Sequence, residues 1–346
     1  MKGIKDELLF TLLKNYFLIY LPNQRNASPH TITTYKTVWS KFLEFAAKKK
    51  GIKSSDITME MLDYDMVSEY LDSLSSKKGM TVSTRNNRLA AIRAFFMYAS
   101  ACSPEYMAQM NEISRIKPQK QDIFRGVDYM TEEAVQALLD APDTSDKLGR
   151  RDRCIFATMY DTGARIQEIL NLRICDLTLD KTAKVILHGK GNKVRTVPLM
   201  KNTVELIKAY MKEFHPDEPM ESDEYLFYTA REGGRKKMND DTIRCRMMKY
   251  VPIAKDKCHL VPDNVHPHLL RHSRAMHLYQ NGMSLDLISQ WLGHSSLETT
   301  LIYAHADTEQ KRRAIEAAQG KGLNIDVKPE KYTITDDDLI KRLYGL

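Results

Sequence analysis

The stretch VHPHLLRHSRAMHLYQNGMSLDLISQWLGHSSLETTLIYAHA, residues 265–306, collects more reactive side chains than any other part of this chain. It holds His268 and Arg271 three residues apart, His294 after a Leu-Gly pair, and Tyr303 nine residues later. Imidazole, guanidinium and phenol groups can bind a phosphate or move a proton. The stretch therefore predicts one part of a phosphoryl-transfer site.

Two upstream segments supply further cationic groups. The helical pattern of residues 151–172 breaks at a Thr-Gly pair, so that Arg165 opens a new helix with Glu168 on the same face. Residues 184–199 change to β-branched runs joined by HGKGNK, which predicts a β-hairpin with Lys190 at its turn. An ordinary exposed loop lysine is the commoner alternative for Lys190.

The first 115 residues have helical apolar spacing throughout, which predicts a bundle of roughly four or five helices. The clearest of these helices are expected at residues 31–50, 65–75 and 84–100. The apolar N-terminus is interrupted by Lys14 and lacks a small-residue cleavage site. These features favour an amphipathic first helix over a signal peptide.

Helical periodicity disappears over residues 116–128, where proline, glycine and charged residues gather, so this segment is predicted to be a linker. The chain then divides into a helical domain at 1–115, a second domain at 129–325 and a tail at 326–346.

The second domain is expected to begin with a helix capped by Thr131. Further helices are expected at residues 204–214, 240–251 and 308–319. In the tail, the apolar stripe of residues 335–346 predicts a helix that is too short to be stable alone in water. This tail helix should dock on its own domain or on a neighbouring molecule.

Positive charge is concentrated in the first part of the chain. Residues 1–128 hold 19 Lys and Arg against 13 Asp and Glu, whereas residues 129–346 hold 33 against 32. A basic first domain indicates a polyanionic partner, and a solvated charged surface is an equally good explanation of the charge alone. The side chains predicted to contact phosphates or base edges are Thr81, Ser83, Arg85, Asn86, Arg88 and Arg93 on one helix, and Arg231, Arg235, Lys236 and Lys237 in a glycine-containing loop.

Several other classes of protein and site are disfavoured. The 5 cysteines are scattered and form no CxxC pair, which fits a reducing cytoplasm. No apolar run approaches the ~20 residues that span a bilayer, so a soluble protein is expected. The histidines at 266, 268, 272 and 277 match no zinc motif and have no carboxylate among them, so no metal site is expected.

Taken together, these motifs resemble the tyrosine recombinase (phage integrase) family. The segment TGARIQE, which contains Arg165 and Glu168, looks like the first catalytic box of that family. HGKGNKVRTVPL looks like its β-hairpin, while PHLLRH, LGHSS and TLIY look like its second box in the usual order. The six matching catalytic positions are Arg165, Lys190, His268, Arg271, His294 and Tyr303.

The resemblance implies a mainly α-helical fold with a small β-sheet or hairpin: an N-terminal helical core-binding (SAM-like) domain and a mixed α/β catalytic domain. It implies that Tyr303 attacks a DNA phosphate to form a 3′-phosphotyrosyl link, with Lys190 as general acid and Glu168 in a supporting role. No metal or nucleotide cofactor is implied. The expected assembly is a homotetramer on two double-stranded DNA sites, monomeric or weakly oligomeric without DNA, and the expected biological setting is a mobile element.

Two other functions are compatible with parts of this pattern. A type IB topoisomerase would use similar chemistry to relax DNA without exchanging partners. A DNA-binding regulator could keep the fold without catalysis. The compact helical first domain and the docking-type tail favour a recombinase over a topoisomerase, and the six intact catalytic positions disfavour a non-catalytic regulator.

Overall fold

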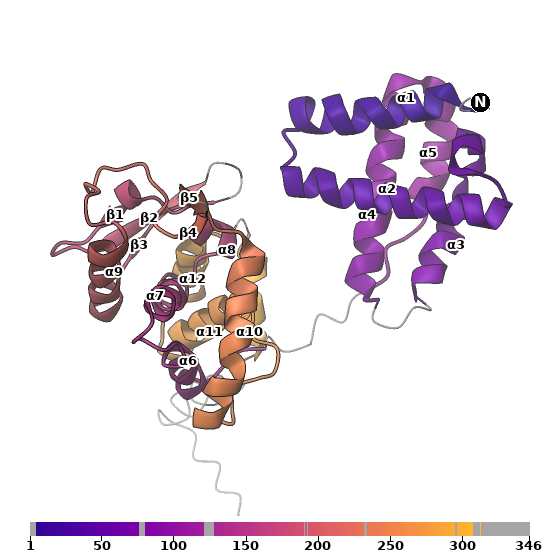
Figure 1. The fold of residues 1–346 in the computed structure, drawn as a ribbon. Helices are drawn as coiled ribbons and strands as arrows, with labels where there is room; N and C mark the ends of the chain where they lie inside the picture. The colour runs from indigo at the N-terminus through magenta and orange to yellow at the C-terminus, as the bar shows by residue number, and fades with distance from the viewer. Residues whose placement is uncertain are drawn as a thin grey trace, which may run out of the picture. The chain divides into compact units, whose positions relative to one another are not determined.

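The computed structural model describes residues 5–75, 80–120, 128–189, 191, 193–231, 234–294, 296–306 and 312. The chain forms two compact units, Met1–Ile123 and Phe124–Leu346 (Figure 1). Each unit has a large hydrophobic core of its own. No helix within the described ranges is long and apolar enough to cross a lipid bilayer.

The described secondary structure of the first unit is entirely helical. Its elements are α1 (Glu7–Asn15), the π-helix η1 (Tyr16–Gln24), α2 (Pro29–Lys50), the short 3-10 turns η2 (Ser54–Asp56) and η3 (Met59–Met61), α3 (Tyr64–Ser75), α4 (Val82–Cys102), the 3-10 turn η4 (Pro104–Tyr106) and α5 (Met107–Ser114). The predicted first helix and the three predicted longer helices are therefore confirmed, with bounds that differ by a few residues.

Local capping explains where the longest helix of this unit begins and ends. The Ser28 hydroxyl accepts a hydrogen bond from the Thr31 backbone N–H at 3.2 Å, which satisfies a donor in the first turn of α2. Gly51 ends the helix with φ of 65°, a left-handed conformation that glycine adopts without steric cost.

Aromatic side chains hold the core of the first unit together. Trp39 on α2 and Phe95 on α4 lie with ring centroids 4.4 Å apart and an interplanar angle of 62°. Phe95 also makes an edge contact with Tyr16 at 5.4 Å. Because edge-to-face aromatic pairs add to the burial of apolar area, these contacts fix α2 and α4 against the N-terminal helical segment.

The second unit combines helices with two small antiparallel sheets. Its elements are α6 (Glu132–Leu139), α7 (Lys147–Thr162), α8 (Ile166–Asn171), η5 (Ile174–Asp176), β1 (Leu177–Thr178), β2 (Lys184–His188), β3 (Val194–Pro198), α9 (Lys201–Phe214), β4 (Tyr228–Arg231), β5 (Gly234–Lys237), α10 (Asp240–Lys257), α11 (Pro267–Gln280), α12 (Leu285–Leu292) and α13 (Glu298–Ala306). Thr131 caps α6 as predicted, since its hydroxyl accepts from the Ala134 N–H at 3.3 Å.

The predicted hairpin is present as strands β2 and β3, which pair from Lys184 with Pro198 to His188 with Val194. β1 extends this sheet to three strands in the order β1-β2-β3. The second sheet, formed by β4 and β5, was not predicted, because every side chain of β5 is exposed and the strand shows no apolar alternation.

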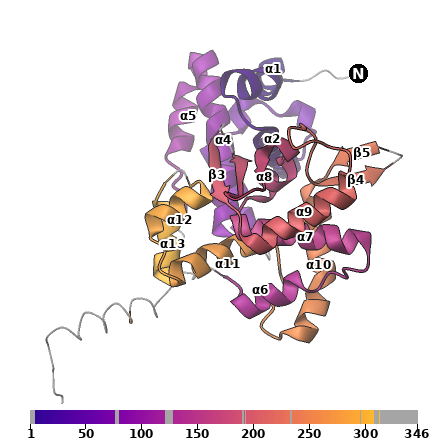
Figure 2. The same ribbon diagram turned by 90° about the vertical axis from the view of Figure 1, so that its left-hand side faces the viewer.

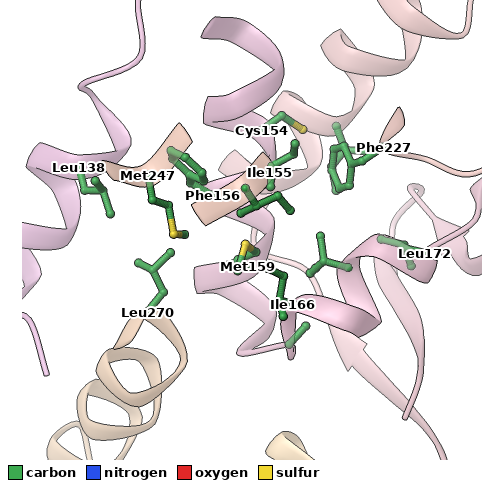
Figure 3. Close-up of a cluster of buried hydrophobic side chains, with 14 of the residues drawn as sticks. Leu138, Cys154, Ile155, Phe156, Met159, Ile166, Leu172, Phe227, Met247 and Leu270 are labelled. Atoms are coloured by element: carbon green, nitrogen blue, oxygen red, sulfur yellow. The ribbon is translucent and has the colours of Figure 1, made fainter. Parts of the chain in front are cut away.

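Helix α7 lies at the centre of the second unit. Figure 3 shows Phe156 of α7 close to Leu138 of α6, Met247 of α10 and Leu270 of α11, all of which are buried. α7 also packs against α9, as Figure 2 shows. A helix covered on several sides gives the unit a rigid frame, and the turn at its C-terminus carries the first site residue.

Three of the predicted helices differ from the prediction or cannot be compared with it. α10 continues to Lys257 rather than ending at Val251, although Pro252 lies inside it. Proline removes one backbone donor, and burial of the neighbouring Val251 and Ala254 offsets that cost. The predicted helices at residues 308–319 and 335–346 lie outside the described residues apart from Arg312, which is helical.

Candidate active site

Arg165 begins helix α8 as its N-cap residue. Its backbone N–H donates to Glu168 Oε2 at 2.8 Å, and its Nη1 donates to Glu168 Oε1 at 3.0 Å. Its Nη2 donates to the Gly293 carbonyl at 3.2 Å. About a third of the side chain, 34%, remains exposed, so the guanidinium is fixed in place and can still contact a phosphate.

Arg271 lies on α11 and is almost completely buried. Its Nη1 donates to the Gly163 carbonyl and its Nη2 to the Leu292 carbonyl, both at 2.6 Å. Burial and the nearby charge of Arg165 lower the pKa of Arg271 to about 9, which leaves the side chain charged at neutral pH.

A single turn at the end of α12 therefore receives both guanidinium groups. Arg271 donates to the carbonyl of Leu292, and Arg165 donates to the next carbonyl, that of Gly293. Gly293 has φ of 63°, the left-handed conformation that ends α12. The residue that follows is His294, so three of the predicted site residues converge on this turn although they come from distant parts of the sequence.

Glu168 has a second cationic partner, Arg195 on β3, which was not predicted as a site residue. Arg195 donates from Nη1 to Glu168 Oε1 at 2.8 Å and from Nη2 to Glu168 Oε2 at 2.7 Å. Burial raises the pKa of Glu168, but the bonds from Arg195 and Arg165 and their charges lower it more, so the pKa lies below its ordinary value. The available signal was the place of Arg195 in the same motif as Lys190.

Tyr303 lies on α13 with 0% of its surface exposed. Its hydroxyl shares a hydrogen bond of 2.9 Å with Nδ1 of His272, another residue that was not predicted for the site. Burial raises the pKa of Tyr303 to about 12, and the charge of Arg271 acts in the opposite direction. Burial, followed by neighbouring positive charge such as that of Arg271, lowers the pKa of His272 to about 4, so both hydrogen-bonded groups are neutral at pH 7.

His268 and His294 differ in their surroundings. His268 is exposed on α11, whereas His294 is half-buried and shares a hydrogen bond of 2.8 Å between its Nδ1 and Thr300 Oγ1. Desolvation and the positive charge of Arg271 lower the pKa of both imidazoles, in the case of His294 to about 4. Both are therefore neutral hydrogen-bonding groups near neutral pH.

Two further histidines of the opening stretch, His266 and His277, have structural partners. His266 caps α11, since its Nδ1 accepts from the Leu269 N–H at 3.2 Å. His277 shares a hydrogen bond of 2.7 Å between its Nδ1 and the Tyr160 hydroxyl. Within the part of the chain that the structure describes, no three His, Cys, Asp or Glu side chains come together as metal ligands.

Lys190 lies outside the described residues, although the hairpin that carries it is well defined on both sides. The Gly189 N–H donates to the Lys193 carbonyl at 2.7 Å across the turn. His188, the last residue of β2, has Nε2 2.9 Å from Asp176 Oδ1. The placement of Lys190 as the catalytic lysine remains a prediction from the sequence.

Several of the α4 side chains that were predicted to contact a nucleic acid make hydrogen bonds inside the first unit. Arg85 and Arg88 are buried, and Arg88 Nη1 donates to the Tyr70 hydroxyl at 3.1 Å. Asn86 exchanges bonds with the Gln119 backbone, and Arg93 Nη2 donates to the carbonyls of Ser114 and Ile116. The exposed members of the predicted set are Thr81 and Ser83 at the start of the helix.

The second predicted group belongs to the β4–β5 hairpin. Arg235 Nη1 donates to Glu218 Oε1 at 2.8 Å, and Lys237 Nζ donates to Asn171 Oδ1. Lys236 is exposed on β5, and the side chain of Arg231 lies outside the described part of the structure. Arg235, Lys236 and Lys237 form an exposed basic strand, and the contact of the predicted group with a nucleic acid remains a prediction.

Comparisons with known proteins agree with this architecture. The chain matches the phage integrase family over residues 128–310 and the phage integrase N-terminal SAM-like domain over residues 15–101. It is 34% identical over 343 residues to the putative integrase/recombinase y4rC of Sinorhizobium fredii, and the match covers 99% of each chain. It is 30% identical over 302 residues to the tyrosine recombinase XerC of Pelotomaculum thermopropionicum, which covers 86% of this chain and 94% of that one.

A solved structure shows the same fold. The XerH site-specific recombinase bound to its difH substrate in a pre-cleavage complex is 26% identical, with a TM-score of 0.60, and the match covers 91% of this chain and 90% of that chain. The predicted fold class, a helical SAM-like domain followed by a mixed α/β catalytic domain, is confirmed. The chain belongs to the tyrosine recombinase (phage integrase) family and is a site-specific DNA recombinase.

Proposed function

We propose that this enzyme cleaves and rejoins double-stranded DNA through Tyr303. The observation that carries this proposal is the turn at Gly293, which binds two arginines. The Gly293 carbonyl accepts a hydrogen bond from Arg165, and the preceding carbonyl, that of Leu292, accepts one from Arg271. Two guanidinium groups fixed beside His294 can hold the non-bridging oxygens of a phosphate as negative charge develops on them. His268 adds an exposed imidazole on the same helix as Arg271.

The chemistry exchanges one phosphodiester for another. Tyr303 Oη attacks phosphorus and gives its proton to water, a 3′-phosphotyrosyl bond forms, and the bond to the 5′ oxygen breaks. Lys190 donates a proton to that departing oxygen. Rejoining runs in reverse: a 5′-hydroxyl from the same or another strand attacks the phosphorus of the phosphotyrosyl link and displaces the Tyr303 oxygen. The phosphodiester is therefore restored without another energy source.

The described state precedes this attack. A phenol with no exposed surface cannot reach a phosphate, so Tyr303 must leave its pocket when DNA binds. Leaving the pocket removes the burial that raises the pKa of Tyr303, whereas the charge of Arg271, which lowers that pKa, can act at the phosphate. DNA binding would thus expose and activate the nucleophile together.

The test is covalent capture on a nicked DNA site, where the cleaved end diffuses away. Tyr303→Phe should bind the site as tightly as the wild type and form no covalent adduct, because only the hydroxyl is removed. Denaturing electrophoresis of labelled DNA reports the adduct. An adduct that persists in this variant would identify another nucleophile and overturn the proposal.

We also propose that the active assembly is a homotetramer on two DNA sites, in which the predicted tail helix at residues 335–346 docks on the next protomer. Thr81 and Ser83, at the exposed start of α4, together with the basic strand β5, would contact the phosphate backbone. Truncation after Asp326 should then reduce two-site synapsis in a gel-shift assay while single-site binding persists. Full synapsis by the truncated enzyme would count against tail exchange.

For the biological role, we propose integration and excision of a mobile element, carried out in the cytoplasm. The relative from Sinorhizobium fredii has a name that refers to integration as well as recombination. Inverted repeats flanking the gene are the expected genomic sign. A recognition site confined to the chromosome-dimer resolution locus would instead indicate a housekeeping role.

A further inference from the structure

Arg195 is bonded through all three nitrogens of its guanidinium group. It lies on β3, opposite Leu187 of β2, and only 12% of its side chain is exposed. Nη1 and Nη2 make a two-point contact with the Glu168 carboxylate, and Nε donates to the Trp291 carbonyl at 2.8 Å. One planar guanidinium thus joins three segments that are far apart in sequence.

The first connection leads to Arg165. Each carboxylate oxygen of Glu168 accepts one bond from Arg195 and one from Arg165: Oε1 from the Arg165 side chain and Oε2 from its backbone. The carboxylate is only 3% exposed, so water cannot replace a missing donor. Without Arg195, Glu168 would lose half of the bonds that hold it and could no longer fix the direction of the Arg165 guanidinium.

The second connection leads to the turn before His294. Besides its bond to Trp291, Arg195 packs directly against Gly293, where an added Cβ would lie 3.1 Å from both Cδ and Nη1 of Arg195. The same turn receives the bond from Arg165 Nη2. Arg195 therefore supports the backbone on which Arg165 and His294 meet.

We propose that Arg195 is a positioning residue for strand cleavage. Acting through Glu168 and the Gly293 turn, it holds Arg165, His294 and the β2–β3 hairpin in fixed positions relative to one another. This proposal rests on the proposed roles of Arg165 and His294 in binding the scissile phosphate. A lysine keeps the charge of Arg195 but has no planar fork, so it cannot bond both oxygens of Glu168 and the Trp291 carbonyl together.

The experiment measures single-turnover covalent capture on a nicked site together with DNA affinity and thermal unfolding. Arg195→Lys should lower the capture rate about 100-fold, the size expected when catalytic groups are displaced by about 1 Å, while DNA affinity is unchanged. The matched control is Arg150→Lys. Arg150 makes a similar two-point contact with Glu213, at 2.8 and 2.6 Å, and its replacement should leave capture unchanged.

A double-mutant cycle with Glu168→Gln separates positioning from general destabilisation. Because Arg195 acts in part through Glu168, Arg195→Gln should cause a clearly smaller loss of capture in the Glu168→Gln background than in the wild type, and the loss that remains reports the bond to Trp291. The double variant also leaves no unpaired buried carboxylate, so it provides the comparison if Arg195→Gln alone does not fold. Additive losses in the cycle, or wild-type capture by Arg195→Lys, would overturn the proposal.

Covalent capture by the wild-type enzyme distinguishes the role of Tyr303 from the role of Arg195. If the proposed function is wrong, the wild-type enzyme forms no adduct that depends on Tyr303. If only the role of Arg195 is wrong, the wild-type enzyme forms that adduct and the Arg195 variants form it at the same rate.

Discussion

At the scale of single residues, the most consequential contact joins Tyr303 to His272. A fully buried phenol needs a hydrogen-bond partner, and Nδ1 of His272 provides it at 2.9 Å. A histidine with a pKa of about 4 is poorly matched to take the proton of a phenol with a pKa of about 12. We therefore interpret His272 as a group that stabilises the buried position of Tyr303.

Replacement of His272 by leucine tests this interpretation. The unpaired Tyr303 hydroxyl should destabilise the catalytic unit by about 1–3 kcal/mol, the usual cost of an unsatisfied buried polar group. His272→Asn, which keeps a hydrogen-bonding group, should be less destabilised. Denaturant unfolding measures both variants, and covalent capture should stay within about tenfold of the wild type because His272 is not the base. Unchanged stability together with a loss of capture above 100-fold would instead make His272 the proton acceptor.

At the scale of secondary-structure elements, the β2–β3 hairpin links the catalytic residues to the frame of the domain. Its strands are paired over five residues each, and Arg195 ties β3 to both α8 and the end of α12. Val185, Leu187 and Val197 lie on the same face of the hairpin as Arg195, and their burial anchors that face in the core. The turn that carries Lys190 is thus attached to a rigid base while its sequence, rich in glycine, suits close approach to a DNA backbone.

This arrangement makes a prediction for Lys190. Lys190→Ala should slow cleavage of an ordinary phosphodiester about 100- to 10,000-fold, the range for loss of a general acid. It should slow cleavage much less when the 5′ bridging oxygen is replaced by sulfur, because a thiolate leaves without a proton. Parallel capture rates on the two substrates give the answer. An equal loss on both would exclude Lys190 as the general acid.

At the scale of the whole molecule, the two units are expected to respond differently to pH. Nine of the 10 histidines lie in the second unit, and the first unit contains only His30. Burial, reinforced by nearby positive charges, lowers the pKa of His272 and His294 to about 4. In an unfolded chain both would titrate near 6.5. The unfolded state therefore binds more protons than the folded state between these values.

The stability of the second unit should consequently be complete above pH 6.5 and should fall as the pH decreases from 6.5 towards 4. Each of the two histidines contributes at most ~3 kcal/mol to this loss, and solvent around the partly exposed rings reduces it. Calorimetry of the full chain at several pH values measures the effect, with the transition of the first unit as internal control. The variant with both His272→Asn and His294→Asn should show a weaker pH dependence; an unchanged slope would contradict this assignment.

The sequence by itself determined the helices, the β2–β3 hairpin and the family, because apolar periodicity, capping residues and short motifs act between residues that are close along the chain. It also identified Arg165, Arg271 and His294, which the folded chain brings together at one turn. The sequence did not predict the β4–β5 hairpin, because the exposed side chains of β5 show no apolar alternation. It also did not predict the hydrogen bonds that Arg88 and Arg93 make within the first unit.

Only the tertiary structure decided the roles of Arg195 and His272 and the burial of Tyr303. Arg195 and the carbonyl of Trp291 are 96 residues apart, and His272 and Tyr303 are 31 residues apart. No local propensity encodes such contacts, because they arise only when separate elements pack around one core. The reactive stretch at residues 265–306 supplies the nucleophile, and the packing of α8, β3 and α12 decides how the groups around it are held.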